Sequence, residues 1–145
     1  MCLESDAIVI GTPIYYGSIS SSAQAFLEKL LFAADTYVLD EDGNRVSKIK
    51  KEIKTAMIYT MNVTKEMDYF NGEDQLAIMR GYLTAIFGEC ESLYAYDTKQ
   101  FKKYDPYLNN MFDPELKEQS KEVQFPKDCK KAYELGESLS KLNNE

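Results

Sequence analysis

Short apolar runs alternate along the chain with stretches whose apolar residues recur at helical spacing. Residues 6–11 form a continuous apolar run bounded by turn signals, and residues 54–62 form a second run of the same kind. Continuous runs of this length are typical of strands covered on both faces, as in a parallel sheet. Residues 91–97 predict a third strand. The pattern therefore predicts one α/β domain over residues 1–145, built on a parallel sheet with three main strands.

Helical periodicity follows each predicted strand. A first helix is expected to begin near Ser20, Ser21 or Ser22, any of which can cap it, and its buried stripe consists of Ala23, Phe26, Leu27, Leu30, Leu31 and Ala34. A second helix is expected over about residues 73–87, with Asn71 as its cap and Gly88 as the glycine that ends it. Its apolar face consists of Leu76, Met79, Leu83, Ile86 and Phe87.

The rest of the chain predicts loops and two shorter helices. Residues 12–18 are expected to form a loop, because Pro13 lacks a donor and Gly17 permits unusual dihedral angles. Residues 35–47 predict a small hairpin, and residues 63–72 and 99–112 predict loops. Pro114 can start a short helix through about residue 121. Pro126 can start the last helix, whose inner side is expected to carry Cys129, Tyr133, Gly136 and Leu139.

The composition is that of an ordinary globular domain, with 145 residues, 44% hydrophobic and 28% charged. No apolar run approaches the roughly 18 residues that span a bilayer. Residues 1–6 have neither the basic nor the apolar region of a signal peptide, so we expect a cytoplasmic protein. The net charge of −7 is spread along the chain. This argues against a nucleic-acid partner, because phosphate backbones require a clustered positive surface.

The sequence contains no histidine, which removes Ser–His and Cys–His nucleophilic schemes and the commonest metal ligand. Cys2, Cys90 and Cys129 form no CxxC pair, so zinc, iron–sulfur and dithiol sites have no support. We expect each cysteine to be reduced and partly buried, and we expect no metal site. Any enzymatic chemistry must then come from a cofactor or from carboxylates.

Two charged clusters each have two interpretations. The basic run over residues 48–54 either contacts a phosphate or a nicotinamide nucleotide, or is a solvated segment that leads into the second strand. Asp40, Glu41 and Asp42 either bind a cation or form a solvated turn. The solvated interpretation is favoured in both cases, and for the acidic cluster the reason is that the spacing of a calcium loop is absent.

The run SDAIVIGTPIYYGSI at residues 5–19 resembles the third strand and following loop of flavodoxin-like NAD(P)H-dependent FMN reductases. It is most similar to the branch that includes iron–sulfur flavoproteins. Residues 58–62 resemble that branch's fourth strand and next loop, and residues 125–129 resemble clostridial-type members. The resemblance covers essentially the whole chain. It implies a flavodoxin-like three-layer parallel sheet, an FMN cofactor and NAD(P)H as electron donor.

The N-terminal third of such reductases has no counterpart in residues 1–145. The resemblance implies a truncated domain in which strands 1 and 2, the phosphate-binding loop and the cysteine cluster for the iron–sulfur centre are missing. FMN binds such a sheet between strands 1 and 3. Loss of several charge-assisted hydrogen bonds, each worth roughly 1.5–3 kcal/mol, would therefore weaken FMN binding by powers of ten.

The retained half of the pocket is implied to hold the isoalloxazine ring. The cofactor-binding residues carried over by resemblance are Thr12, Pro13, Ile14, Tyr15, Tyr16, Gly17, Ser18, Thr60, Met61 and Asn62. Alternatively, the two tyrosines pack against the sheet end or a partner, residues 60–62 are an ordinary strand end, and the serines at 20–22 only cap a helix. No catalytic residue is named, because the flavin ring itself accepts the hydride at N5.

Without strands 1 and 2, the strand at residues 6–11 lies at an edge of the sheet. An uncovered apolar edge promotes pairing with another chain. We therefore expect a homodimer or higher homo-oligomer, and an upstream chain that supplies the phosphate loop is another implied partner. Two functions follow: a flavin-dependent NAD(P)H oxidoreductase with weakened FMN binding, or a non-enzymatic, self-associating interaction module.

Overall fold

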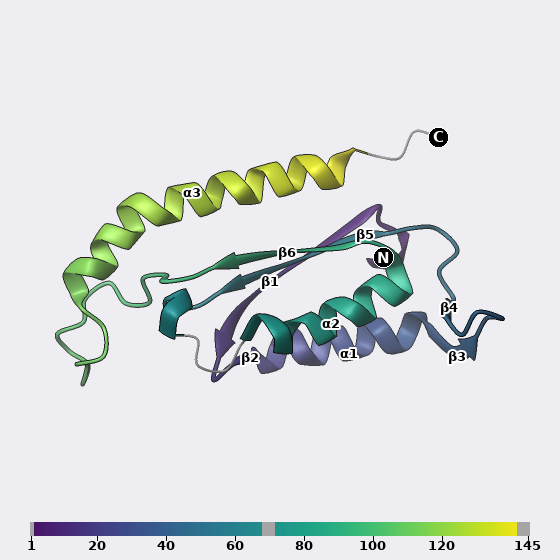
Figure 1. Ribbon diagram of the computed structural model, residues 1–145, viewed down its shortest axis with the longest axis horizontal. Helices are drawn as coiled ribbons and strands as arrows, with labels where there is room; N and C mark the ends of the chain where they lie inside the picture. The colour runs from purple at the N-terminus through teal and green to yellow at the C-terminus, as the bar shows by residue number, and fades with distance from the viewer. Residues whose placement is uncertain (1, 68–71, 142–145) are drawn as a thin grey trace.

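The structure of the protein is a computed structural model that describes residues 2–67 and 72–141 (Figure 1). Its elements in chain order are η1 (Cys2–Glu4), β1 (Ala7–Tyr15), β2 (Ser18–Ile19), α1 (Ser21–Ala34), β3 (Asp35–Leu39), β4 (Arg45–Ser47), β5 (Lys54–Thr60), η2 (Lys65–Met67), α2 (Gly72–Phe87), β6 (Cys90–Ala95) and α3 (Pro114–Ser140). The main sheet has the strand order β2-β1-β5-β6, and β3 and β4 form a separate two-stranded sheet. The chain is a mixed α/β protein with a mostly parallel sheet.

The three predicted parallel strands pair in chain order. Ile10 of β1 is in register with Met57 of β5, and Met57 is in register with Ser92 of β6. Helices α1 and α2 lie on one face of this sheet, and α3 lies on the other (Figure 1). The buried core between the sheet and the first two helices includes Ile8, Ile10, Leu27, Leu30, Ala34, Met57, Tyr59, Leu76, Leu83, Ile86 and Phe87.

One end of each of the first two helices follows a local signal in the sequence. Ser20 is the N-cap of α1, and its Oγ accepts a hydrogen bond from the Ala23 N–H at 3.4 Å. Gly88 follows α2 with a φ of 106°, a backbone conformation that favours glycine at a helix C-terminus. A Cβ at Gly88 would lie 2.7 Å from Glu52 Cγ. These boundaries confirm the predictions, whereas Asn71 lies outside the described residues.

The segment over residues 12–18 is a strand and a hairpin, not a loop. β1 continues to Tyr15, and β2 returns antiparallel beside its last two residues. Tyr16 and Gly17 form the turn, with φ angles of 52° and 77°. Two positive φ angles match the twist of a tight hairpin. Pro13 therefore lies within the strand, and the prediction of a loop is wrong because backbone pairing continues past it.

The two C-terminal helices predicted from Pro114 and Pro126 are one helix, α3. The Asp113 carboxylate caps it by accepting the Glu115 N–H at 2.8 Å. Pro126 lies inside α3, which bends along its length (Figure 1). A proline removes one backbone hydrogen bond and bends a helix without ending it when the flanking turns keep theirs. The predicted break is therefore wrong.

The predicted inner side of the last helix is also wrong in most positions. Cys129, Tyr133 and Gly136 are exposed, and only Leu139 is buried as expected. The buried positions of α3 are Lys117, Asp128 and Leu139. Two of these three are charged, so the side of α3 that faces the sheet is partly polar.

The predicted hairpin over residues 35–47 is confirmed by the pairing of β3 with β4. The Asp40 carboxylate accepts the backbone N–H groups of Asp42 at 3.0 Å and Asn44 at 2.8 Å. The Asn44 backbone bond is the main cause that lowers the pKa of Asp40. This carboxylate thus closes its own turn.

Within residues 2–67 and 72–141, no helix has the length and apolar character that a membrane crossing requires.

Candidate functional site

The carboxyl ends of β1, β5 and β6 lie side by side at one edge of the sheet. Pro13 is in register with Thr60, which is in register with the last residue of β6. β5 and β6 both end two residues earlier than predicted, and Asp97, with a φ of 55°, turns the chain away after β6. In open parallel sheets, ligands bind in the crevice outside this edge. The two predicted halves of the site, residues 12–18 and 60–62, therefore meet here.

Two of the predicted site residues serve the fold itself. Thr12 is buried, and its hydroxyl accepts the backbone N–H of Ser20 at 3.1 Å. This bond fastens β1 to the N-cap of α1, so the Thr12 side chain faces the interior. Met61 is also buried, and its carbonyl accepts two hydrogen bonds from Thr98, one from the backbone N–H and one from the hydroxyl, both at 2.9 Å.

The other predicted residues at the hairpin are accessible from solvent. Tyr15, Tyr16 and Ser18 are exposed around the turn. The half-buried residues of the predicted set are Pro13, Ile14, Gly17, Thr60 and Asn62. A Cβ at Gly17 would lie 3.6 Å from Gln75 Oε1, so the hairpin tip lies beside the start of α2.

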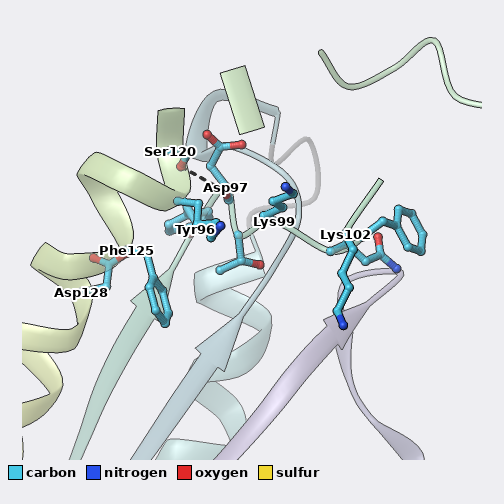
Figure 2. Close-up of a pocket in the computed structure, with 11 residues that line it drawn as sticks. Tyr96, Asp97, Lys99, Lys102, Ser120, Phe125 and Asp128 are labelled. Atoms are coloured by element: carbon cyan, nitrogen blue, oxygen red, sulfur yellow. Dashed lines mark hydrogen bonds between the residues drawn. The ribbon is translucent and has the colours of Figure 1, made fainter. Parts of the chain in front are cut away.

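A cavity of about 490 Å³ opens at the β6 end of this edge, between the chain that follows β6 and α3 (Figure 2). Its volume lies in the range of small-molecule sites. The lining contains none of the ten residues predicted from the sequence. It consists of Tyr96, Asp97, Thr98, Lys99, Gln100, Phe101, Lys102, Ser120, Lys121, Phe125 and Asp128.

Asn62 connects the predicted edge to this cavity. Its Nδ2 donates to Gln100 Oε1 at 3.1 Å, and its backbone carbonyl accepts a hydrogen bond from Lys117 Nζ. The Asn62 Oδ1 atom is buried and has no hydrogen-bond partner among the described residues. A buried acceptor without a donor costs free energy. A ligand that brings an N–H or O–H group to this atom would recover that cost.

Lys117 fixes α3 over the edge of the sheet. The residue is 3% exposed, and its Nζ donates to Asp97 Oδ1 and to the Asn62 carbonyl. The same Nζ lies 4.7 Å from the centre of the Phe112 ring. One turn further along, Ser120 Oγ donates to the Asp97 carbonyl at 3.1 Å (dashed in Figure 2). These contacts hold the α3 wall of the cavity in place.

Aromatic rings and ammonium groups share the wall of the cavity. Phe125 extends from α3, and Lys102 lies on the opposite side (Figure 2). Phe101 stacks on Tyr107 with ring centres 4.1 Å apart and meets Tyr104 edge-on at 5.4 Å. Stacking of this kind fixes the orientation of an aromatic ring, so the loop after β6 presents a rigid apolar surface.

The charges around the cavity are unevenly compensated. Glu118 accepts hydrogen bonds from Lys121 at 2.8 Å and from Lys99, and these bonds lower the pKa of Glu118 to about 2. The Glu118 carboxylate in turn raises the pKa of Lys121. Lys102 has no polar partner in the described part of the chain. The wall thus carries three ammonium groups, two of which share the Glu118 carboxylate that lies outside the lining.

The two aspartates in the lining are each paired with a lysine that lies outside the lining. Lys117 pairs with Asp97, and Asp128 accepts hydrogen bonds from Gln124 at 2.8 Å and from Lys131 at 3.4 Å. The cavity therefore offers rings and positive charge rather than free carboxylates.

The other charged and cysteine candidates lie away from this cavity. In the basic run, Lys51 Nζ donates to the Glu4 carbonyl at 2.8 Å and pairs with Asp6 at 3.2 Å. Cys90 is buried and Cys129 is exposed, and both are free thiols. Residues 2–67 and 72–141 contain no group of three or more histidine, cysteine, aspartate or glutamate side chains able to hold a metal ion.

No family model matches the chain, and no curated protein matches it. Its fold is similar to that of a solved thermophilic tryptophan halogenase from Streptomycin violaceusniger, with a TM-score of 0.51 and 14% sequence identity. The match covers 72% of this chain and 61% of that chain, so this chain spans less than two thirds of the halogenase. At this identity, the likeness concerns the fold alone.

The family assignment from residues 5–19, 58–62 and 125–129 is wrong. No model of an FMN reductase or an iron–sulfur flavoprotein matches the chain, and a solved structure to which it is similar is that of a tryptophan halogenase. An apolar strand followed by proline and glycine occurs in many unrelated α/β folds. Such a run predicts a strand and a turn, but it does not specify a family.

Proposed function

We propose that this chain is a flavin-dependent oxidoreductase domain that binds FMN in the cavity after β6 and along the neighbouring strand ends. The observation that carries the proposal is the position of a cavity of small-molecule size beside the carboxyl end of β6, at the edge where three parallel strands end. The bound flavin would supply the hydride chemistry, with NAD(P)H as donor. The chain's own residues then have to bind the ring, orient it and limit access of water.

The residues around the cavity fit the two chemical parts of FMN. Phe101 and Phe125 offer apolar faces to a planar ring, and the ammonium group of Lys102 is available to a phosphate.

We also infer a flavodoxin-like arrangement of the sheet. It is supported by the chain-order pairing of β1, β5 and β6, and by helices on both faces of the sheet. In such an arrangement, β1 takes the position of the third strand. The outer edge of β1 is then the place where further strands of the sheet would pair.

Titration with FMN, followed by quenching of flavin fluorescence, tests the proposed function. We expect saturable quenching and NADH or NADPH oxidation above the rate of free flavin. Phe125→Ala should weaken binding about tenfold, because a stacked aromatic contact is worth about 1 kcal/mol beyond the area it buries. Phe32→Ala, an exposed phenylalanine of α1, serves as the matched control. No quenching at millimolar FMN, or equal effects of the two variants, would contradict the proposal.

One observation favours the second function, a self-associating interaction module. β1 pairs with β5 from Ala7 to Pro13, but β2 covers only the last two residues of its other edge. Val9, on this strand, is 52% exposed. An uncovered, uncharged edge strand pairs readily with another strand, and we propose a second copy of the chain as its partner.

Light scattering tests this second function. The wild-type chain should form a dimer, and Val9→Lys should be monomeric because a lysine on an edge strand opposes pairing. Val38→Lys in β3 is the matched control, since Val38 is 53% exposed. A monomeric wild type, or a dimer that Val9→Lys does not dissociate, would contradict self-association through the edge of β1.

A further inference from the structure

The Glu118 carboxylate lies between two ammonium groups that line the cavity. One of its oxygens accepts from Lys99 and the other accepts from Lys121 at 2.8 Å. Both lysines belong to the cavity wall, whereas Glu118 does not. The carboxylate therefore binds two of the three ammonium groups of the lining from a position outside the cavity.

This ion-pair group is accessible to exchange. The Glu118 side chain is 42% exposed, and that of Lys121 is 56% exposed. The ion pair of Glu118 with Lys121 therefore contributes little free energy, because water and salt screen it. The Lys99 side chain is only 17% exposed, so a rotation of Glu118 toward solvent would leave the Lys99 ammonium group without this partner until an incoming anion replaces it.

A phosphate group can replace the carboxylate on the same two cations. It carries up to two negative charges and three acceptor oxygens, and its hydrogen bonds to ammonium groups are among the stronger ones in proteins. Lys102 lines the same cavity and is not engaged by Glu118; its side chain has to turn toward Lys99 and Lys121 to reach the same phosphate group. The aspartates of the lining, Asp97 and Asp128, already have cationic partners, so they oppose an incoming anion less than free carboxylates would.

We propose that Lys99, Lys102 and Lys121 form a phosphate subsite that Glu118 occupies when no phosphate ligand is bound. The incoming phosphate displaces the Glu118 carboxylate, which makes Glu118 an internal competitor for the ligand. The identity of the ligand as FMN rests on the proposed function, but the preference for a phosphate group does not.

Calorimetric titration of the full chain with three probes tests the subsite: FMN, riboflavin and inorganic phosphate. Glu118→Gln should tighten the binding of FMN and phosphate about threefold to tenfold, because the carboxylate no longer competes for Lys99 and Lys121. The binding of riboflavin, which lacks a phosphate, should be unchanged. Lys102→Met should weaken FMN and phosphate but not riboflavin.

Glu134→Gln is the matched control, because Glu134 lies on the same helix and forms an exposed ion pair with Lys130 at 3.7 Å. It removes the same charge away from the cavity and should change none of the three affinities. Circular dichroism of each variant checks that the fold is kept. The subsite is disproved if Glu118→Gln leaves phosphate and FMN binding unchanged or weakens it.

The two proposals fail in distinguishable ways. If FMN and riboflavin bind equally well and phosphate does not bind, flavin binding stands and the phosphate subsite is wrong. If phosphate binds and Glu118→Gln tightens it while neither flavin binds, the subsite stands and the proposed function is wrong.

Discussion

Three tyrosines at the ends of β5 and β6 stack in a row but differ in their hydrogen bonds. The ring centres of Tyr59 and Tyr94 are 5.1 Å apart, and those of Tyr94 and Tyr96 are 6.3 Å apart. The Tyr96 hydroxyl donates to Glu73 at 2.8 Å. Tyr59 is 0% exposed, and its hydroxyl has no partner in the described part of the chain. Tyr59 therefore carries a desolvation cost that Tyr96 does not.

We expect Tyr59→Phe to raise the free energy of unfolding by about 1 kcal/mol, because it removes an unpaired buried hydroxyl. Tyr96→Phe is the matched comparison and should lower it by about 1–2 kcal/mol, because it leaves the Glu73 carboxylate without this donor. Urea denaturation measures both. A loss of stability in Tyr59→Phe would show that its hydroxyl has a partner.

The same residue predicts a dependence of stability on alkaline pH. Burial raises the pKa of Tyr59 above its ordinary value of 10.0. Above pH 10 the unfolded chain loses this proton while the folded chain keeps it, so stability falls as the pH rises. The stability that depends on this proton is fully present below pH 10 and is lost as the pH rises toward the raised pKa of the folded state. The free energy of unfolding, measured by urea denaturation at several pH values around and above 10, should therefore fall less steeply with pH for Tyr59→Phe than for the wild type.

Lys117 is the residue on which the corner between α3 and the sheet depends. Lys117→Met should lower the free energy of unfolding by about 3 kcal/mol, because it leaves Asp97 and the Asn62 carbonyl without their buried donor. Lys130→Met, which removes an exposed ion pair on the same helix, should change stability by less than about 0.5 kcal/mol. Equal effects in urea denaturation would contradict this role.

At the scale of the elements, the sequence predicts those helices and helix ends that depend on residues close together in the chain. Helices α1 and α2 follow from apolar spacing, and their ends follow from Ser20 and Gly88. Proline and glycine at residues 12–18 were ambiguous, because Gly17 fits a loop and a tight hairpin equally well. The pairing of β2 with β1 decides between them, and pairing is not a local property.

Helix α3 shows why the candidate site was only partly predictable. Its inward positions include Lys117 and Asp128, so it lacks an apolar stripe at helical spacing. Lys117 finds its partners on residues 62 and 97, far away in the sequence. The meeting of residues 12–18 with residues 60–62 follows from parallel pairing, whereas the cavity depends on where α3 lies over the sheet.

Pro126 controls the shape of α3. Pro126→Ala should raise the free energy of unfolding by about 1–3 kcal/mol, because it restores a backbone hydrogen bond and removes the clash of the ring with the preceding turn. Lys127→Ala, the neighbouring exposed position, should change it little. Urea denaturation followed by circular dichroism measures both. A loss of stability in Pro126→Ala would mean that packing of α3 requires the bend.

At the scale of the whole molecule, a ligand that binds only the folded chain stabilises all of it. FMN at 100 times its dissociation constant should add about 2.7 kcal/mol to the free energy of unfolding. For a chain of 145 residues, this corresponds to a rise in Tm of about 8 °C. Thermal denaturation with and without FMN measures the shift. A Tm that does not change at saturating FMN would count against a site in the folded chain.

The hairpin of β3 and β4 projects from the end of the molecule opposite the loop that follows β6 (Figure 1). Its turn is closed by the Asp40 carboxylate and by Gly43, whose φ is 83°, and it forms a sheet of its own. A fluorophore or surface tether attached at Glu41 would therefore leave the far end of the molecule open to solvent. Immobilisation through this hairpin would leave the cavity after β6 facing solvent.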